Sequence, residues 1–245
     1  MKKIFCKFAV MTFVIGISVA YFSSTGCSSL RSIKGDGNIV SSEKTVSTFE
    51  KIVCEGFVEV RFHSSEKYRA VVTVDANLDE YVDISTRNNV LNIGTKRGHD
   101  YKFTKFLVDV YCPALKGVSM SGSGRFESVE KIIASTFETS VSGSGRIEGT
   151  IECDNFSGRI SGSGRISVGG ISKDVNVIIS GSGNFNGSQF SAKNATVNVS
   201  GSGKASICVE DNLRAGVSGS GGIDYCGEPG KVDTNVSGSG RIRKM

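Results

Sequence analysis

The feature that most limits how this chain can fold is the tetrapeptide Ser-Gly-Ser-Gly, which occurs seven times in its second half. The repeats begin at residues 121, 142, 161, 180, 200, 218 and 237, so successive starts are separated by 21, 19, 19, 20, 18 and 19 residues. A fixed period near this length is typical of solenoid proteins, in which each repeat is one structural unit stacked on the last. The repeat therefore predicts a stack of similar rungs.

Apolar side chains recur at fixed distances on both sides of each tetrapeptide. Before it the chain alternates with a period of two, which predicts a strand with one buried face. The alternating positions are Phe137, Thr139, Val141, Phe156, Gly158, Ile160, Val175, Val177, Ile179, Ala195, Val197, Val199, Leu213, Ala215, Val217, Val232, Thr234 and Val236. A second row follows the tetrapeptides, at Phe126, Ile147, Ile166, Phe185, Ala205, Ile223 and Ile242. Each unit thus supplies two or three short strands to a shared core.

A third column predicts a corner in each rung. Six residues before each later tetrapeptide stand Thr136, Asn155, Asp174, Asn194, Asn212 and Lys231. Most of these residue types tolerate turns and left-handed backbone. The differences in unit length fall between the second apolar row and this column, so we expect an outward loop there.

These columns predict an all-β fold, a right-handed parallel β-helix of about seven rungs over residues 118–245. A propeller blade needs about 40 residues, twice what each unit has. The tetrapeptide itself fits either an extended strand with outward hydroxyls or a corner where glycine supplies a positive φ. The corner is the favoured interpretation.

Residues 36–117 predict an irregular β cap that joins the first rung, so that 36–245 form one continuous domain. The segments "FEKIVCEGFVEVRFH", "YRAVVTVDANL" and "KFLVDVYCPAL" alternate or run apolar, and "RNN" has the composition of a hairpin tip. The composition agrees with an all-β chain, because 31 Gly, 2 Pro and no Trp accompany abundant Val, Ile and Ser.

The first 27 residues have the organisation of a secretory leader. A basic start, "MKKIFCK", precedes the apolar run "FAVMTFVIGISVAYF", and the segment ends at Gly26 and Cys27. This end resembles a bacterial lipobox, although Ser24 stands where the common pattern has Leu, and it predicts lipidation of Cys27. An ordinary cleaved signal and a single membrane anchor are the alternatives, and the run is short of the roughly 20 residues that span a bilayer.

We therefore expect an exported lipoprotein that a membrane holds through its N-terminal lipid, with residues 28–35 as a short tether. Ser28 and Ser29 follow the cysteine without an Asp, which by resemblance to Gram-negative sorting rules indicates the outer membrane. Whether the protein faces the periplasm or the cell exterior stays open.

Five cysteines remain after Cys6 and Cys27, and their spacing is not that of a zinc site. Cys208 and Cys226 each lie eight places after the start of a tetrapeptide, so they stack on neighbouring rungs about 4.8 Å apart, within disulfide range. A disulfide and a pair of buried thiols are both compatible with this placement.

Taken together, these features resemble the head GIN domain family of "putative" autotransporter adhesins, found among exported proteins of Bacteroides-like bacteria. The resemblance covers residues 36–243 and includes the lipobox-like leader, "DANLDEYVDI", "NNVLNIGT", "VDVYCPALKGVSMSGSG" and the recurring "SGSGRI". It implies a right-handed β-helix-like fold in the cell envelope. The chain departs from an autotransporter because it has no translocator barrel.

Catalysis is not predicted, nor is a metal or cofactor. Many parallel β-helices cleave polysaccharides, which requires paired carboxylates or a calcium cluster on one face. Glu127, Glu148 and Asp224 share one register, but Ser and Asn interrupt that column, which favours a solvated face paired with arginine. His63 and His99 have no partners that would form a catalytic triad.

A binding surface is the stronger hypothesis. The residue after each tetrapeptide is basic in five of seven rungs, at Arg125, Arg146, Arg165, Lys204 and Arg241, with Asn184 and Gly222 between them. Stacked cations form a stripe suited to an anionic glycan, lipopolysaccharide phosphates or another acidic envelope protein. The alternative is a face that only keeps the protein soluble. The net charge of +5 is too low to indicate nucleic acid.

The sequence thus predicts a non-enzymatic envelope lipoprotein that acts as an adhesin or as a binding or scaffold module. A polysaccharide-processing enzyme and a purely structural envelope protein are the alternatives, and homo-oligomerisation stays open.

Overall fold

A computed structural model describes residues 32–245 of the chain. The predicted leader, Cys27 and residues 28–31 of the tether lie outside the described residues. Almost every described segment is a strand, and the one short helix is the 3-10 helix η1 (Ala76–Tyr81). The all-β expectation is confirmed.

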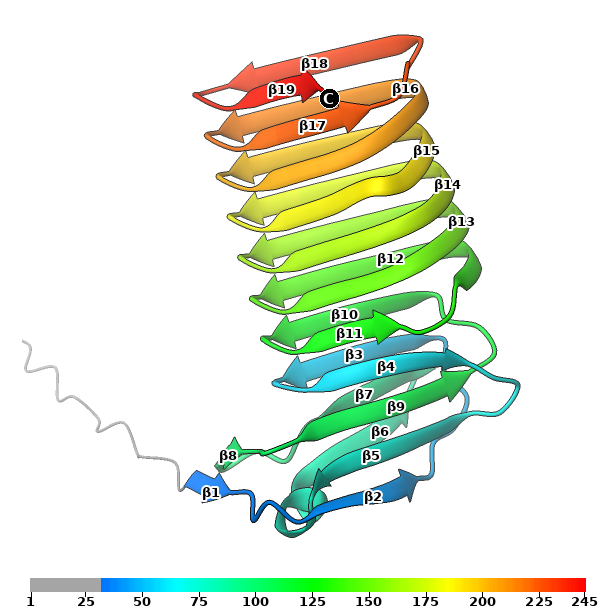
Figure 1. The fold of residues 1–245 in the computed structure, drawn as a ribbon, viewed down its shortest axis with the longest axis vertical. Coiled ribbons are helices and arrows are strands. Elements are labelled where there is room, and N and C mark those ends of the chain that lie inside the picture. Colours follow the sequence, from blue (N-terminus) through cyan, green and yellow to red (C-terminus); the bar gives the residue numbers. More distant parts are fainter. Residues whose placement is uncertain (1–31) are drawn as a thin grey trace, which may run out of the picture. The chain divides into compact units, whose positions relative to one another are not determined.

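The second half of the chain is a parallel β-solenoid of two facing sheets (Figure 1). Each rung runs along one sheet, curves round an edge and returns along the other, in the middle rungs as one long strand. The strands are β10 (Gly117–Gly122), β11 (Arg125–Ser128), β12 (Ile132–Gly143), β13 (Arg146–Gly162), β14 (Arg165–Gly181), β15 (Asn184–Gly201), β16 (Lys204–Gly219), β17 (Gly222–Cys226), β18 (Lys231–Ser237) and β19 (Arg241–Lys244). The predicted solenoid of about seven rungs is confirmed.

Both predicted apolar rows fill the space between the sheets, except in the last rung, where Val232 and Val236 are each 43% exposed because no further rung covers them. Equivalent residues of successive rungs lie in register, as Ile147 with Ile166 and Ile166 with Phe185, and all three are at most 1% exposed. The other apolar row, which precedes the tetrapeptides, faces this row across the core. It is equally buried in these rungs, for example at Ile160 and Ile179. Because neighbouring rungs bury each other's apolar surface, stability comes from the stack rather than from any one rung.

The Ser-Gly-Ser-Gly tetrapeptide forms the tight turn between the two sheets, as the corner interpretation predicted. Its first glycine has a left-handed backbone, with φ of 111° at Gly162. Its second glycine faces the core so closely that a Cβ on Gly164 would overlap Val141 and lie 2.8 Å from the carbonyl oxygen of Gly145. The amides of successive turns stay hydrogen-bonded, as Arg165 N to Gly145 O at 2.9 Å.

The opposite edge is the predicted corner, but for a different physical reason. The strand ladder skips one residue there, between the pairs Cys153–Ser172 and Asn155–Asp174. The corner residues do not adopt the left-handed backbone that their types tolerate, since Asn88 and Asn89 are the only non-glycine residues of 32–245 with a positive φ.

Side chains stabilise this corner instead. Asn194 Nδ2 donates to Asp174 Oδ1 at 2.9 Å, and Asn212 Nδ2 donates to Asn194 Oδ1 at 2.7 Å, which forms a ladder across three rungs. Register shifts within β14, β15 and β16, between Ser167 and Gly169 and between Gly187 and Ser191, accommodate the differences in unit length. Bulges therefore replace the outward loop that we expected.

The N-terminal segment supplies one more rung and then closes the stack. Its strands are β1 (Ser32–Lys34), β2 (Ile39–Lys44), β3 (Lys51–Gly56), β4 (Glu59–Ser64), β5 (Arg69–Asp75), β6 (Val82–Arg87), β7 (Val90–Thr95), β8 (Asp100–Lys102) and β9 (Phe106–Cys112). Strands β3 and β4 pair in parallel with β10 and β11, and their turn is Glu55-Gly56-Phe57-Val58. Antiparallel β2, β5 and β6 and the buried Leu78 of η1 close the end.

Candidate binding surface

The predicted basic column lies on the outer face of the sheet that each rung enters after its tight turn. Register pairs join Arg125 to Arg146, Arg146 to Arg165, and so on through Asn184, Lys204, Gly222 and Arg241. The rungs are about 4.8 Å apart. At the capped end the column begins with an acid, Glu59, opposite Arg125.

Ion pairs neutralise only one end of this column. Arg125 Nη2 lies 2.6 Å from Glu148 Oε2 and 3.4 Å from Glu127 Oε2, and the hydrogen bond to Glu148 raises the pKa of the guanidinium. Within residues 32–245, Arg146, Arg165, Lys204 and Arg241 form no ion pair. We call Arg146, Arg165 and Lys204, with Asn184 among them, the free-cation strip.

The neighbouring column makes the centre of this strip polar and uncharged. Glu148 is followed on the next rungs by Ser167, Asn186 and Ser206. Asn186 Oδ1 accepts a hydrogen bond from Ser206 Oγ at 3.2 Å. A surface hollow of about 350 Å³ adjoins the strip and contains Glu148, Ser167 and Asn186 in its wall. Hydroxyl and amide groups beside unpaired cations suit a hydrated, anionic ligand.

The carboxylates of this face do not form a catalytic pair. Glu127 and Glu148 contact Arg125, and Asp224 contacts Arg243 at 2.5 Å. The sequence anticipated this pairing with arginine. Each of these acids therefore contacts a guanidinium rather than a second carboxylate.

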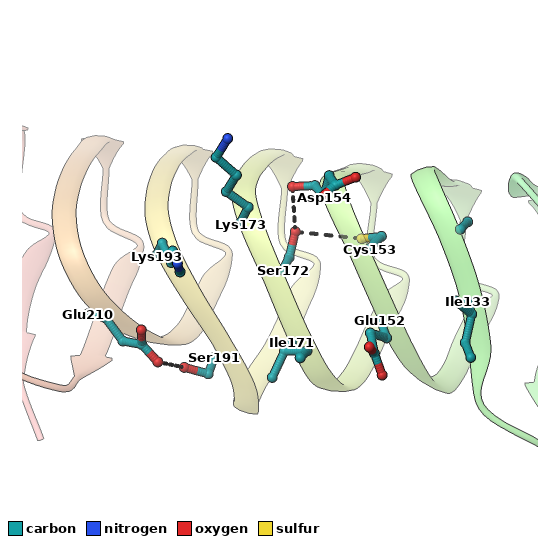
Figure 2. A pocket seen from close by; sticks show the side chains of 11 residues that line it. Ile133, Glu152, Cys153, Asp154, Ile171, Ser172, Lys173, Ser191, Lys193 and Glu210 are labelled. Atoms are coloured by element: carbon teal, nitrogen blue, oxygen red, sulfur yellow. Dashed lines mark hydrogen bonds between the residues drawn. The ribbon is translucent and has the colours of Figure 1, made fainter.

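A second hollow, of about 490 Å³, lies along the corner edge (Figure 2). Ile133 and Ile171 flank Glu152 on its wall, with 66% and 54% of their surfaces exposed. Ser172 is nearly buried, and its Oγ lies 3.2 Å from Asp154 O and 3.0 Å from Asp174 O. Cys153 Sγ donates to the same hydroxyl at 3.5 Å, so Ser172 links the backbone of two rungs at this corner.

A cluster that the sequence analysis missed lies on β4 and β9 of the cap. Asp109 accepts bidentate hydrogen bonds from Arg61, both 2.8 Å, and lies 3.0 Å from His63 Nε2. Burial raises the pKa of Asp109. The hydrogen bonds from Arg61 and His63 lower the pKa by more than burial raises it, so the pKa of Asp109 lies below its usual range. His63 also stacks on Tyr111, whose other neighbour is Arg69 at 4.1 Å from the ring centroid.

The signal for this cluster was the alternation "EVRFH" against "VDVY", but the pairing of β4 with β9 is needed to place Arg61 opposite Asp109. Its cation and anion are mutually satisfied, so it stabilises the cap.

The cysteines divide into a stacked pair and three separate thiols. Cys208 and Cys226 are register partners with Cα atoms 4.4 Å apart and are joined as a disulfide in this structure. Cys54 and Cys112 are buried, and burial raises the pKa of each thiol to about 12. Cys153 is half-buried in the wall of the corner hollow.

Two further findings concern the described part of the chain only. From residue 32 onward no helix is both long and apolar enough to cross a membrane. The same residues hold no group of three or more His, Cys, Asp or Glu side chains placed to bind a metal ion.

The fold and this surface define the class of the protein, a capped parallel β-solenoid whose repeated face is polar and basic. The sequence profile of one family, "Putative auto-transporter adhesin, head GIN domain", matches residues 48–229. The chain belongs to this family, as its sequence resemblance predicted. The family description names an adhesin, which indicates an exported, envelope-associated protein.

Solved structures share the fold. A "putative adhesin" from Bacteroides fragilis is 18% identical, with a TM-score of 0.82, and the match covers 87% of this chain and all of that one. A "putative lipid binding protein" from Parabacteroides distasonis is 26% identical, with a TM-score of 0.74 and coverage of 88% and 100%. A "putative adhesin" from Parabacteroides merdae is 25% identical, with a TM-score of 0.71 and coverage of 88% and 99%. A comparison with curated proteins finds no match.

Proposed function

We propose that this protein is a non-enzymatic binding module of the cell envelope that holds an extended anionic ligand, such as an acidic glycan, along the free-cation strip. The observation that carries the proposal is the alignment of Arg146, Arg165 and Lys204 on nearby rungs without an ion pair among residues 32–245. Regularly spaced cations match a polymer with regularly spaced negative charges. The adhesin description of the family agrees with a binding role.

Membrane attachment through Cys27 completes the proposal. A lipidated cysteine at the start of the mature chain would keep the solenoid on the outer membrane, because acyl chains contribute about 0.8 kcal/mol for each buried methylene. The leader ending at Gly26 and Cys27 and the envelope-associated family support this attachment. Labelling of cells with a radioactive fatty acid tests it, since the Cys27→Ser protein should carry no label.

The mature chain from Ser28 tests ligand binding directly. We compare the triple variant Arg146→Ser, Arg165→Ser and Lys204→Ser with the unchanged protein on an array of acidic and neutral glycans. Three lost contacts should weaken binding to acidic glycans about tenfold, and raised salt should weaken it further.

A matched control removes three cations elsewhere. Arg159→Ser, Lys173→Ser and Lys193→Ser change the net charge equally but lie on the opposite sheet and at the corner. The control should keep its affinity. Equal losses in both triple variants, or none in either, would contradict the strip as the binding surface.

A further inference from the structure

The capped end of the solenoid carries a two-stranded ribbon that is separate from the main sheets. Strands β1 and β8 pair in parallel, with Ser32 opposite Asp100, Ile33 opposite Tyr101 and Lys34 opposite Lys102. Ile33 and Tyr101 are partly buried and pack against the core, whereas the other side chains are exposed. Alternation therefore gives the ribbon an inner apolar face and an outer polar face.

The outer face places two like charges directly opposite each other. Lys34 and Lys102 are register partners, and neither has an anionic partner within residues 32–245. Like charges in this position destabilise a strand pair. Asp36 and Asp100, the exposed acids nearest to these lysines in the chain, form no ion pair with either of them among residues 32–245. The repulsion is therefore left for an anion from outside the described chain to relieve.

Further cations flank β8 in the sequence. Lys96 and Arg97 lie in the turn between β7 and β8, and Lys105 follows β8; all three are exposed and form no ion pair in the described part of the protein. Asp100 is the one acid between residues 96 and 105. We call Lys34, Lys96, Arg97, Lys102 and Lys105 the ribbon patch.

The ribbon is held firmly to the cap. The buried carboxylate of Asp75 accepts hydrogen bonds from Gly37 N at 3.0 Å and Thr104 N at 2.8 Å, which lie just beyond β1 and β8. Tyr101 also contacts Tyr81 and Phe103, with ring centroids 5.3 and 6.0 Å apart. The ribbon patch is thus a preformed surface.

Chain length limits how far this patch can lie from the proposed anchor. Five peptide steps join Cys27 to Ser32, and an extended chain spans at most about 3.6 Å per residue, or roughly 18 Å in all. A lipidated Cys27 would therefore hold the ribbon within about 18 Å of the bilayer surface, and a tether that is not fully extended would bring it within the range of about 8 Å over which electrostatic attraction acts at physiological salt.

We infer that the ribbon patch docks on the anionic phospholipid headgroups of the membrane that holds Cys27. This location rests on the proposed lipid anchor, but the affinity of the patch does not. Docking would orient the capped end toward the bilayer and the rungs of β18 and β19, at the other end of the solenoid, away from it (Figure 1). The free-cation strip would then be presented along the projecting stack.

The test uses the mature chain from Ser28 without lipid, so that no acyl chain contributes to vesicle binding. We measure co-sedimentation with vesicles of phosphatidylcholine alone and of phosphatidylcholine with about one-third phosphatidylglycerol. The protein should bind the anionic vesicles and not the neutral ones. Lys34→Ser with Lys102→Ser should weaken binding about 25-fold, since each lysine near an anionic surface contributes about fivefold.

Three controls make the outcome decisive. Lys173→Ser with Lys193→Ser removes the same charge at the corner and should bind like the unchanged protein. Inorganic phosphate should displace the protein no better than chloride of equal ionic strength; stronger displacement would point to a free-phosphate site and overturn the inference. The thermal midpoint of the Lys34→Ser, Lys102→Ser variant should not fall, because the substitution removes a repulsion.

Equal binding of the ribbon variant and the unchanged protein to anionic vesicles would also refute the inference. Failure of the anchor has a separate signature, since an unlabelled Cys27 in cells leaves the vesicle measurement unchanged.

Discussion

The chain passes from one sheet to the other at both edges of the solenoid, but the two edges are stabilised in different ways. At the tight-turn edge every regular rung uses the same four residues, and the register from rung to rung is continuous. At the corner edge the ladder skips a residue, and bulges in the strand segments that lead to it absorb one to three residues of difference in length. The tight turn therefore depends on backbone geometry, whereas the corner depends on side chains.

This difference explains which parts of the repeat are constant. A turn whose first glycine needs a positive φ and whose second lies against a neighbouring carbonyl accepts no side chain at either position. A corner stabilised by Asn and Asp hydrogen bonds accepts several residue types and lengths. The three predictions below test this contrast, beginning with the largest effect.

A side chain on the second glycine of a tight turn should be the most damaging change. Gly164→Val would place carbon atoms against Val141 and the carbonyl of Gly145, which belongs to the backbone and cannot move aside. We expect the free energy of unfolding to fall by about 4 kcal/mol, as for severe overpacking of a core. Urea denaturation followed by circular dichroism measures it.

Gly230→Ala is the matched control for this change. Gly230 is exposed, and an added Cβ would lie 3.8 Å from its nearest neighbour, an ordinary contact. Its effect should stay within about 0.5 kcal/mol. Similar losses at both glycines would show that the tight-turn edge is no more constrained than a loop.

Loss of the link between Cys208 and Cys226 should come second. We predict that the two form a disulfide in the exported protein, closing a loop 18 residues long next to the corner edge. Replacing both with Ser should lower the free energy of unfolding by about 3 kcal/mol. Reductant should destabilise the unchanged protein by a similar amount and leave the double variant unaffected.

A thiol count provides an independent check on this link. The mature chain from Ser28, which lacks Cys6 and Cys27, should show three reactive thiols when denatured without reductant, from Cys54, Cys112 and Cys153. Five reactive thiols would rule out the disulfide.

Interruption of the corner ladder should have the smallest measurable effect. Asn194→Ala removes the hydrogen bonds to Asp174 and Asn212, which are part-buried and exposed respectively. The expected loss in free energy of unfolding is about 1.5 kcal/mol. Ser182→Ala, at an exposed turn position with no side-chain hydrogen bond among residues 32–245, should change it by less than about 0.5 kcal/mol. A larger effect at Ser182 would give the serines a structural role that the contrast denies them.

Most of the fold was predictable because the repeat is periodic in sequence. The apolar columns such as Ile147, Ile166 and Phe185 place themselves in register as soon as the tetrapeptides are aligned. The cap was less accessible, because its antiparallel strands and η1 are irregular. Its rung of β3 and β4 has no tetrapeptide and is marked only by Gly56, with φ of 80°.

The position of the candidate surface was predictable from the sequence, but which of its cations form ion pairs was not. The spacing of Arg125, Arg146 and Arg165 placed them in one column, yet only the ion pair with Glu148 distinguishes Arg125 from the others. The cluster of Arg61 and Asp109, and the opposition of Lys34 to Lys102, join residues far apart in the chain through pairings that have no periodic signal.

By itself the sequence determined the rung, its two buried rows and its tight turn, because a strand's alternation and a glycine's conformational freedom are local properties that repetition makes visible. The tertiary structure alone decided which cations stay unpaired, how the corner is held and how the end is capped. These depend on distances between side chains brought together by strand pairing, and ion pairs and hydrogen bonds form over only a few ångströms.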